Sequence, residues 1–244
     1  MAEPGPRILV VQHEAACPPA WFGDWLTEAG CTLDVRHPYS GDELPHELPD
    51  DLGGHQGLLV LGGAMGAHDE ADHPWLAPTK ALVREAAATG VPTLGICLGH
   101  QLVADALGAE VGLNPRGQQL GLLPVGWTDE GGRDELTAPV VGTGVGVQWN
   151  DDVVLRVPEG VAVLATTPEG ELQAARFAPT VWGVQLHPEA HDGVLRVWAE
   201  DEVERDAEGA YEPMLAEVAA ARDQLHDGWR PLALSFAAVV RRAG

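Results

Sequence analysis

The chain has 244 residues, a formal net charge of -23 and three cysteines. This length suits one α/β domain, and the negative charge argues against nucleic acids and anionic membranes as partners. No stretch approaches the roughly 18 apolar residues of a membrane-spanning helix. The N-terminus also lacks the basic start of a signal peptide. Because the cysteines are few and odd in number, we expect no disulfide framework and a cytoplasmic location.

The first part of the chain alternates apolar runs with amphipathic patterns. Strands are predicted at residues 8–12, 32–36 and 57–61, and a fourth ends just before Cys97. Helices are predicted at residues 18–30 and 75–89, and a third follows Cys97. The proline-rich stretch 37–56 between them reads as a loop with one helical turn. This alternation predicts an α/β fold with a mostly parallel sheet and helices on both faces.

The pattern changes after Gly108. Short strands are predicted at residues 120–127, 144–149, 161–166, 172–177 and 181–186, and we expect them to extend the sheet and form an antiparallel flap. Helical patterns follow at residues 194–205, 210–226 and 229–242. The acidic run 200–208 reads as a solvated face or loop. We therefore expect residues 1–192 to form one domain and residues 193–244 to form a helical C-terminal extension packed on it.

Cys97 lies where a buried strand gives way to a helix, with Gly95 and Gly99 two residues to either side. This spacing is the Gly-x-nucleophile-x-Gly turn, here with cysteine as the nucleophile. The helix N-terminus favours the thiolate, and the amide of Leu98 points to where an oxyanion would form. The alternative is a buried structural cysteine at a strand end, against which the paired glycines argue.

Two further segments carry candidate chemistry. His187 and Glu189 follow a predicted strand, with Pro188 fixing the chain between them, so that the carboxylate can orient the imidazole. Gly62 and Gly63 follow another strand, where backbone amides can approach a ligand closely. Taken separately, the first segment also reads as a loop with a surface carboxylate and the second as a plain turn. Together with Cys97 they indicate a nucleophile, a base and an oxyanion hole.

These three segments resemble the class I (triad) glutamine amidotransferase family in motif, order and spacing. Residues 95–101 are similar to its nucleophile motif, residues 183–189 to its His-x-Glu motif, and residues 60–63 to its oxyanion loop. The resemblance covers about residues 8–190. Within the family, the sequence is most similar to stand-alone chains like the glutaminase domain of GMP synthase, whose helical tails contain a stretch like residues 229–236.

The resemblance implies a flavodoxin-like glutaminase that attacks the side-chain amide of glutamine, forms a γ-glutamyl thioester and passes ammonia to a separate synthetase. No metal or organic cofactor is implied. The implied roles are nucleophile for Cys97, general base and acid for His187, orienting carboxylate for Glu189, oxyanion donors for Gly63 and Leu98, and substrate contacts for Gly62 and Gln101.

Three positions depart from the family pattern. Ala64 stands where relatives often have proline, which predicts a less rigid oxyanion loop. Leu186 replaces a common phenylalanine, which is a mild change. Asn150 replaces a frequent histidine beside the substrate pocket, so the details of substrate binding are open.

Other chemistry-bearing residues have simpler interpretations. A group with metal-ligating side chains follows the oxyanion loop, but we favour a solvated loop at the pocket rim: His68, Asp69, Glu70, Asp72 and His73. His100 reads as a helix residue packed behind the nucleophile. Cys17 and Cys31 read as inert thiols.

Three functions remain in view. The first is a glutaminase that serves a separate synthetase, since the residues after the catalytic region are too few for an ATP-dependent domain. The second is a γ-glutamyl peptidase or hydrolase with the same triad. The third is a non-enzymatic regulator, which would need none of Cys97, His187 and Glu189.

Overall fold

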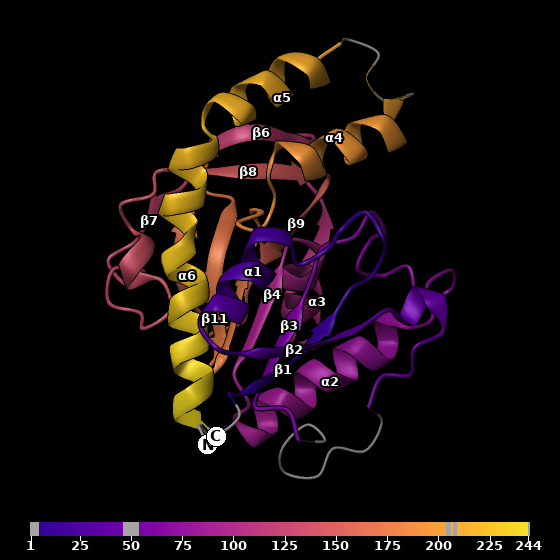
Figure 1. The fold of residues 1–244 in the computed structure, drawn as a ribbon, viewed down its shortest axis with the longest axis vertical. Coiled ribbons are helices and arrows are strands. Elements are labelled where there is room, and N and C mark those ends of the chain that lie inside the picture. Colours follow the sequence, from indigo (N-terminus) through magenta and orange to yellow (C-terminus); the bar gives the residue numbers. More distant parts are fainter. Residues whose placement is uncertain (1–4, 46–53, 204–205, 207–208, 244) are drawn as a thin grey trace.

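The computed structural model describes residues 5–45, 54–203, 206 and 209–243 (Figure 1). Its main sheet has eight strands in the order β2-β1-β3-β4-β12-β11-β10-β7. The first five in this order are parallel: β2 (Thr32–Arg36), β1 (Arg7–Val11), β3 (Gly57–Val60), β4 (Thr93–Ile96) and β12 (Val181–Val184). The last three extend the sheet in antiparallel fashion: β11 (Leu172–Ala178), β10 (Ala162–Thr166) and β7 (Gly126–Trp127).

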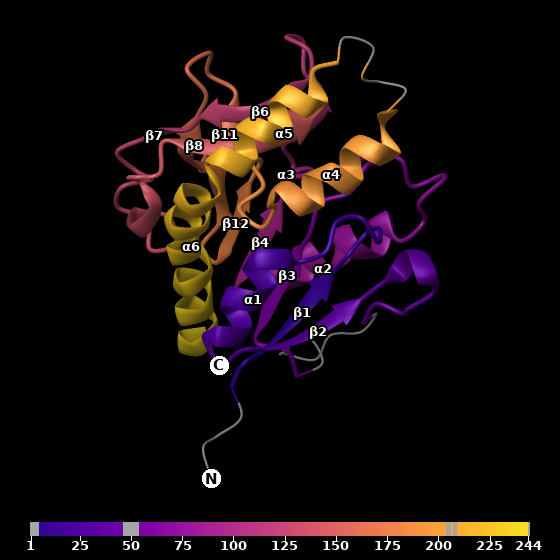
Figure 2. The ribbon, with the colours of Figure 1, turned by 45° about the horizontal axis from the view of Figure 1, so that its top comes forward.

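Helices cover both faces of this sheet, as the strand sequences dictate. Ile8 and Val10 of β1 join one hydrophobic cluster, whereas Leu9 and Val11 join another, because successive side chains point to opposite faces. The first cluster is covered by α1 (Ala20–Glu28) and α6 (Arg222–Ala243), which lie side by side (Figures 1 and 2). The second is covered by α2 (Leu76–Thr89) and α3 (Leu98–Ala106). The predicted α/β class is confirmed.

Two small antiparallel sheets and two helices lie beyond the main sheet. The small sheets pair β5 (Glu110–Leu113) with β9 (Asp152–Arg156), and β6 (Gln119–Pro124) with β8 (Val145–Asn150). Helix α4 (Asp192–Asp201) contacts α5 (Tyr211–Ala220), which packs on β6 (Figure 2). Two single 3-10 turns complete the described elements, at Pro38–Ser40 and Ala138–Val140.

The elements differ from the sequence expectations in three places. Residues 120–127 form two strands rather than one, since β6 pairs with β8 while β7 joins β10. Strands β5 and β9 were missed because each is short and half exposed. The helices expected at 210–226 and 229–242 divide at another point, because α5 ends at Ala220 and α6 begins at Arg222. Helix α6 then runs unbroken through Gly228, where a side chain would collide with Thr143. The loop expected at 37–56 contains the Pro38–Ser40 turn, and its residues 46–53 lie outside the described part.

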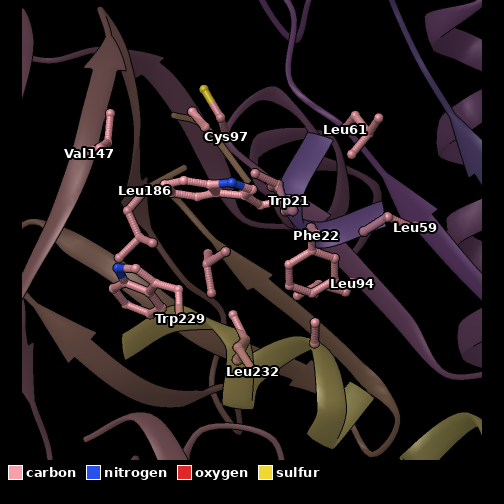
Figure 3. Packing of buried hydrophobic residues seen from close by; sticks show 14 of the residues in the cluster. Trp21, Phe22, Leu59, Leu61, Leu94, Cys97, Val147, Leu186, Trp229 and Leu232 are labelled. Carbon is pink, nitrogen blue, oxygen red and sulfur yellow. The ribbon is translucent and has the colours of Figure 1, made fainter. Parts of the chain in front are cut away.

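The core reaches from the sheet into the C-terminal helix. Figure 3 shows Trp229 of α6 beside Leu186, Leu232 of the same helix farther from Leu186, and Cys97 at the edge of the same cluster. The sulfur of Cys97 points away from these apolar side chains. Helix α6 therefore helps to build the packing beneath the candidate nucleophile. None of the described helices is long and apolar enough to cross a membrane.

Candidate active site

Cys97 forms a sharp turn between β4 and α3. Its backbone has φ 51° and ψ -110°, a conformation that residues with side chains seldom adopt. A Cβ atom on Gly95 would lie 2.3 Å from the carbonyl oxygen of Gly99, and one on Gly99 would lie 2.0 Å from that of Val60. Glycine is thus the only residue that fits at either position, and the turn holds Cys97 in a strained backbone conformation.

His187 lies between Cys97 and Glu189. Its Nδ1 atom is 2.7 Å from Oε1 of Glu189, which assigns the proton to Nδ1 as the donor. Within the described part of the chain, Nε2 has no hydrogen-bond partner. Burial lowers the pKa of His187, but the negative charges of Cys97 and Glu189 outweigh burial and raise this pKa to about 10. The arrangement therefore favours the protonated form of His187.

Neighbouring elements fix the position of the imidazole. The backbone amide of His187 donates to the carbonyl of Val147 at 2.8 Å. The indole of Trp198 in α4 packs against the ring, with centroids 4.7 Å apart. Trp198 is itself held by a hydrogen bond of 2.7 Å from Nε1 to the carbonyl of Ala16. Helix α4 thus contributes to the orientation of the candidate base.

The two candidate oxyanion donors lie beside the nucleophile. Within the described residues, no hydrogen bond engages the amide of Gly63 or of Leu98, so both remain available to a ligand. A Cβ atom on Gly62 would approach His187 Cε1 to 3.3 Å and Cys97 Cβ to 3.7 Å. The absence of a side chain at Gly62 therefore keeps space open next to both groups.

Cys97, His187, Gly63 and Gln101 line a common pocket of about 520 Å³, which is within the range of small-molecule sites. The amide nitrogen of Gln101 donates to the carbonyl of Asp152 at 2.8 Å. Asn150 lines the same pocket and also donates to that carbonyl, at 3.0 Å. Both side chains are therefore held rigidly in the pocket wall.

Sequence reasoning missed two residues near the nucleophile. Nε2 of Gln185 lies 3.7 Å from Sγ of Cys97, at the limit for a hydrogen bond to sulfur. Its place two residues before His187 is a signal in the sequence, because alternate residues of an extended chain share a side. Glu14 reaches the pocket from the loop after β1, and no motif indicated it.

Burial or local contacts account for the remaining candidates. His100 is fully buried behind the nucleophile, and burial lowers its pKa to about 3, so it is neutral. In the group after the oxyanion loop, Asp69 accepts from the amide of Gly66 at 2.7 Å, and Glu70 pairs with Lys80 at 2.5 Å. Within the described ranges, no three metal-ligating side chains are clustered suitably for an ion. All three cysteines are free thiols.

Comparisons with known proteins place this fold in a class. The chain resembles the crystal structure of a glutamine amidotransferase from Thermotoga maritima, with a TM-score of 0.82 over 95% of this chain and 98% of that one, at 22% identity. The class is thus that of glutamine amidotransferase folds. The family model for class-I glutamine amidotransferases matches residues 24–198. The chain belongs to this family.

Two curated relatives differ in their stated functions. The chain is 32% identical to a subunit of the glutamine-hydrolysing GMP synthase of Sulfolobus acidocaldarius, over 59% of this chain and 73% of that protein. It is 25% identical to gamma-glutamyl peptidase 5 of Arabidopsis thaliana, over 61% of this chain and 60% of that protein. Relatives of this chain therefore carry more than one stated activity.

Proposed function

We propose that this chain is a glutaminase of the amidotransferase type, which hydrolyses the side-chain amide of glutamine and supplies ammonia to a separate synthetase. The proposal depends above all on one observation: buried His187 is hydrogen-bonded to Glu189 and lines the same pocket as Cys97. Cys97 and Glu189 together raise the pKa of His187 to about 10. This is the electrostatic arrangement that a thiolate nucleophile and its acid–base partner need.

In the first half of the reaction, the Cys97 thiolate attacks the amide carbon and a C–S bond forms. The amides of Gly63 and Leu98 stabilise the oxyanion. His187 gives its proton to the leaving nitrogen as the C–N bond breaks, and ammonia departs. Glu189 holds the imidazole in the required tautomer and stabilises its charged form.

In the second half, water attacks the γ-glutamyl thioester while His187 accepts a proton from it. The C–S bond breaks, glutamate is released and the thiolate returns. In this scheme Gln101 lines the substrate pocket, and Gly62 leaves room beside Cys97 and His187. A cytoplasmic location suits the three free thiols, since a reducing compartment preserves the nucleophile.

A γ-glutamyl peptidase or hydrolase is the second candidate. The pocket of about 520 Å³ is larger than free glutamine needs, and one relative is named a γ-glutamyl peptidase. The same attack by Cys97 would then release an amine or peptide in place of ammonia. A non-enzymatic regulator is less favoured, because it would need neither the strained Cys97 nor the His187–Glu189 bond.

The test is kcat/KM of the purified chain for glutamine and for a panel of γ-glutamyl peptides and amines, without any partner. We expect weak glutaminase activity and no compound cleaved markedly faster, because amidotransferase subunits gain nothing from hydrolysis without an acceptor. A conjugate preferred by 100-fold or more, about 2.7 kcal/mol in transition-state binding, would contradict the glutaminase proposal and favour the hydrolase.

A further inference from the structure

Glu14 is a half-buried carboxylate in the pocket wall that the proposed reaction does not use. Its Oε1 atom accepts a hydrogen bond of 2.8 Å from the amide of Ala64, the residue directly after Gly63. The same oxygen accepts from the thiol of Cys17 at 3.1 Å. Glu14 therefore links the loop after β1 to the loop that carries the candidate oxyanion donor.

Hydrogen bonds to its main-chain carbonyl hold Glu14 in place just after β1. The main-chain carbonyl of Glu14 accepts from Nε2 of Gln12 at 2.8 Å and from the amide of Cys17 at 3.3 Å. Strand β3 runs parallel to β1 in register, and the amide of Leu61 donates to the carbonyl of Val11 at 3.0 Å. The two loops consequently leave the sheet side by side, and Glu14 joins them.

The oxyanion loop needs such support because two successive glycines leave its peptide planes free to rotate. Gly63 is crowded, since a Cβ atom there would meet Met65 at 2.6 Å, Leu98 at 3.0 Å and His13 at 3.1 Å. Packing thus limits where Gly63 lies, but it does not set the orientation of the peptide group. The hydrogen bond from the amide of Ala64 to Glu14 fixes the next peptide plane, between Gly63 and Ala64. It thereby restricts rotation about the Gly63 α-carbon, which carries the donor N–H on its other side.

We propose that Glu14 is a positioning residue that holds the oxyanion loop through the amide of Ala64 and so aims the Gly63 donor. This inference rests on the proposed function, in which Gly63 stabilises the oxyanion. It also gives Ala64 a role, because proline has no N–H and could not make this bond. In this chain a hydrogen bond restrains the loop at position 64, whereas in chains with proline there the ring would restrain it covalently.

The test compares Glu14→Ala with Glu14→Gln, which keeps an acceptor oxygen. We expect Glu14→Ala to lower kcat for the best γ-glutamyl substrate by about 10- to 100-fold, less than the roughly 100- to 1000-fold loss of a whole donor. KM should change little, and Glu14→Gln should recover most of the activity. Cys17→Ala, which removes the other donor to the same oxygen, should have a smaller effect than Glu14→Ala.

Two measurements distinguish a loss of positioning at the oxyanion loop from a general disruption of the active site. Alkylation of Cys97 by iodoacetamide needs no oxyanion hole, so its rate should be the same in Glu14→Ala and wild type. Hydrogen exchange of the Ala64 amide should accelerate in Glu14→Ala and stay slow in Glu14→Gln. If Glu14→Ala fails to fold, Glu14→Leu replaces it, because leucine keeps much of the side-chain volume but offers the Ala64 amide no acceptor oxygen. It should show the same loss of kcat and the same faster exchange of the Ala64 amide.

The outcomes distinguish this inference from the function on which it rests. An active wild type whose kcat is unchanged in Glu14→Ala would overturn the inference and leave the proposed function standing. An equal loss in Glu14→Ala and Glu14→Gln, with Ala64 exchange unchanged, would also overturn it. A wild type that hydrolyses no γ-glutamyl compound would overturn both.

Discussion

At the scale of single residues, the imidazole of His187 is placed between two negative charges in a buried site. Burial opposes its protonation, while Cys97 and Glu189 favour it and raise its pKa to about 10. The protonated form of His187 should therefore persist throughout the neutral range and be lost only at alkaline pH. The carboxylate of Glu189 is one of the two groups that set this limit.

Glu189→Gln should slow turnover and shift the pH profile. The variant removes a negative charge that raises the pKa of His187, so the alkaline limb of kcat/KM should move to lower pH. The new amide could also donate to Nδ1 and stabilise the wrong tautomer, for a loss of about 100-fold or more, up to roughly 10⁴-fold. Steady-state kinetics across pH 6 to 10 measure both effects, with Cys97→Ala as the fully inactive reference. Full activity at every pH would remove Glu189 from the proposed triad.

Cys97 should be the one thiol that reacts rapidly with a glutamine-like chloroketone. Burial and the neighbouring Glu14 raise the pKa of Cys17 well above its usual value, and burial also raises the pKa of Cys31. Both thiols should remain protonated and slow at neutral pH. Peptide mass mapping after brief labelling would measure this, and preferential labelling of Cys17 or Cys31 would refute the assignment of Cys97.

At the scale of elements, the β4–α3 turn depends on glycine where backbone meets backbone. Gly99→Ala should destabilise the protein by about 3 kcal/mol or more or prevent folding, since its Cβ would lie 2.0 Å from the carbonyl of Val60. Gly142 is an exposed glycine in open space, so Gly142→Ala should stay within about 0.5 kcal/mol. Denaturant unfolding compares the two variants, and equal stabilities would contradict the steric account.

Such elements were predictable from the sequence because their signals are local. The glycines around Cys97 predict the turn, and the apolar runs of β1, β3 and β4 predict strands, each from a few consecutive residues. The role of Glu14 was not predictable, because its hydrogen bond joins it to Ala64, 50 residues away. Such a long-range contact produces no periodic pattern in the sequence. Strand β9 was missed for a related reason. Its sequence is half exposed and lacks a strong strand pattern, and its pairing with β5, which is distant in the sequence, stabilises it as a strand.

At the scale of the whole molecule, we propose that residues 193–244 are part of one folding unit with residues 1–192. Trp229, Leu232, Phe236 and Val240 of α6 are buried in the cluster beneath the sheet. Each contributes about 1.5–3 kcal/mol by burial, so their sum is comparable to the whole stability of a typical domain.

Truncation after residue 192 should therefore abolish cooperative unfolding. Circular dichroism and calorimetry would show a single transition for the full chain and none for the shortened one. A shortened chain that melts cooperatively at the temperature of the full chain would contradict this single unit and establish an independent extension.

The most direct test of the central claim is to quench the enzyme during turnover of glutamine and determine the mass of the peptide that contains Cys97. The proposed mechanism predicts a γ-glutamyl adduct on Cys97, corresponding to glutamine minus ammonia, that is lost on treatment with hydroxylamine. Cys97→Ala should form no adduct and release no ammonia. Glutamine hydrolysis by Cys97→Ala at the wild-type rate would contradict the account.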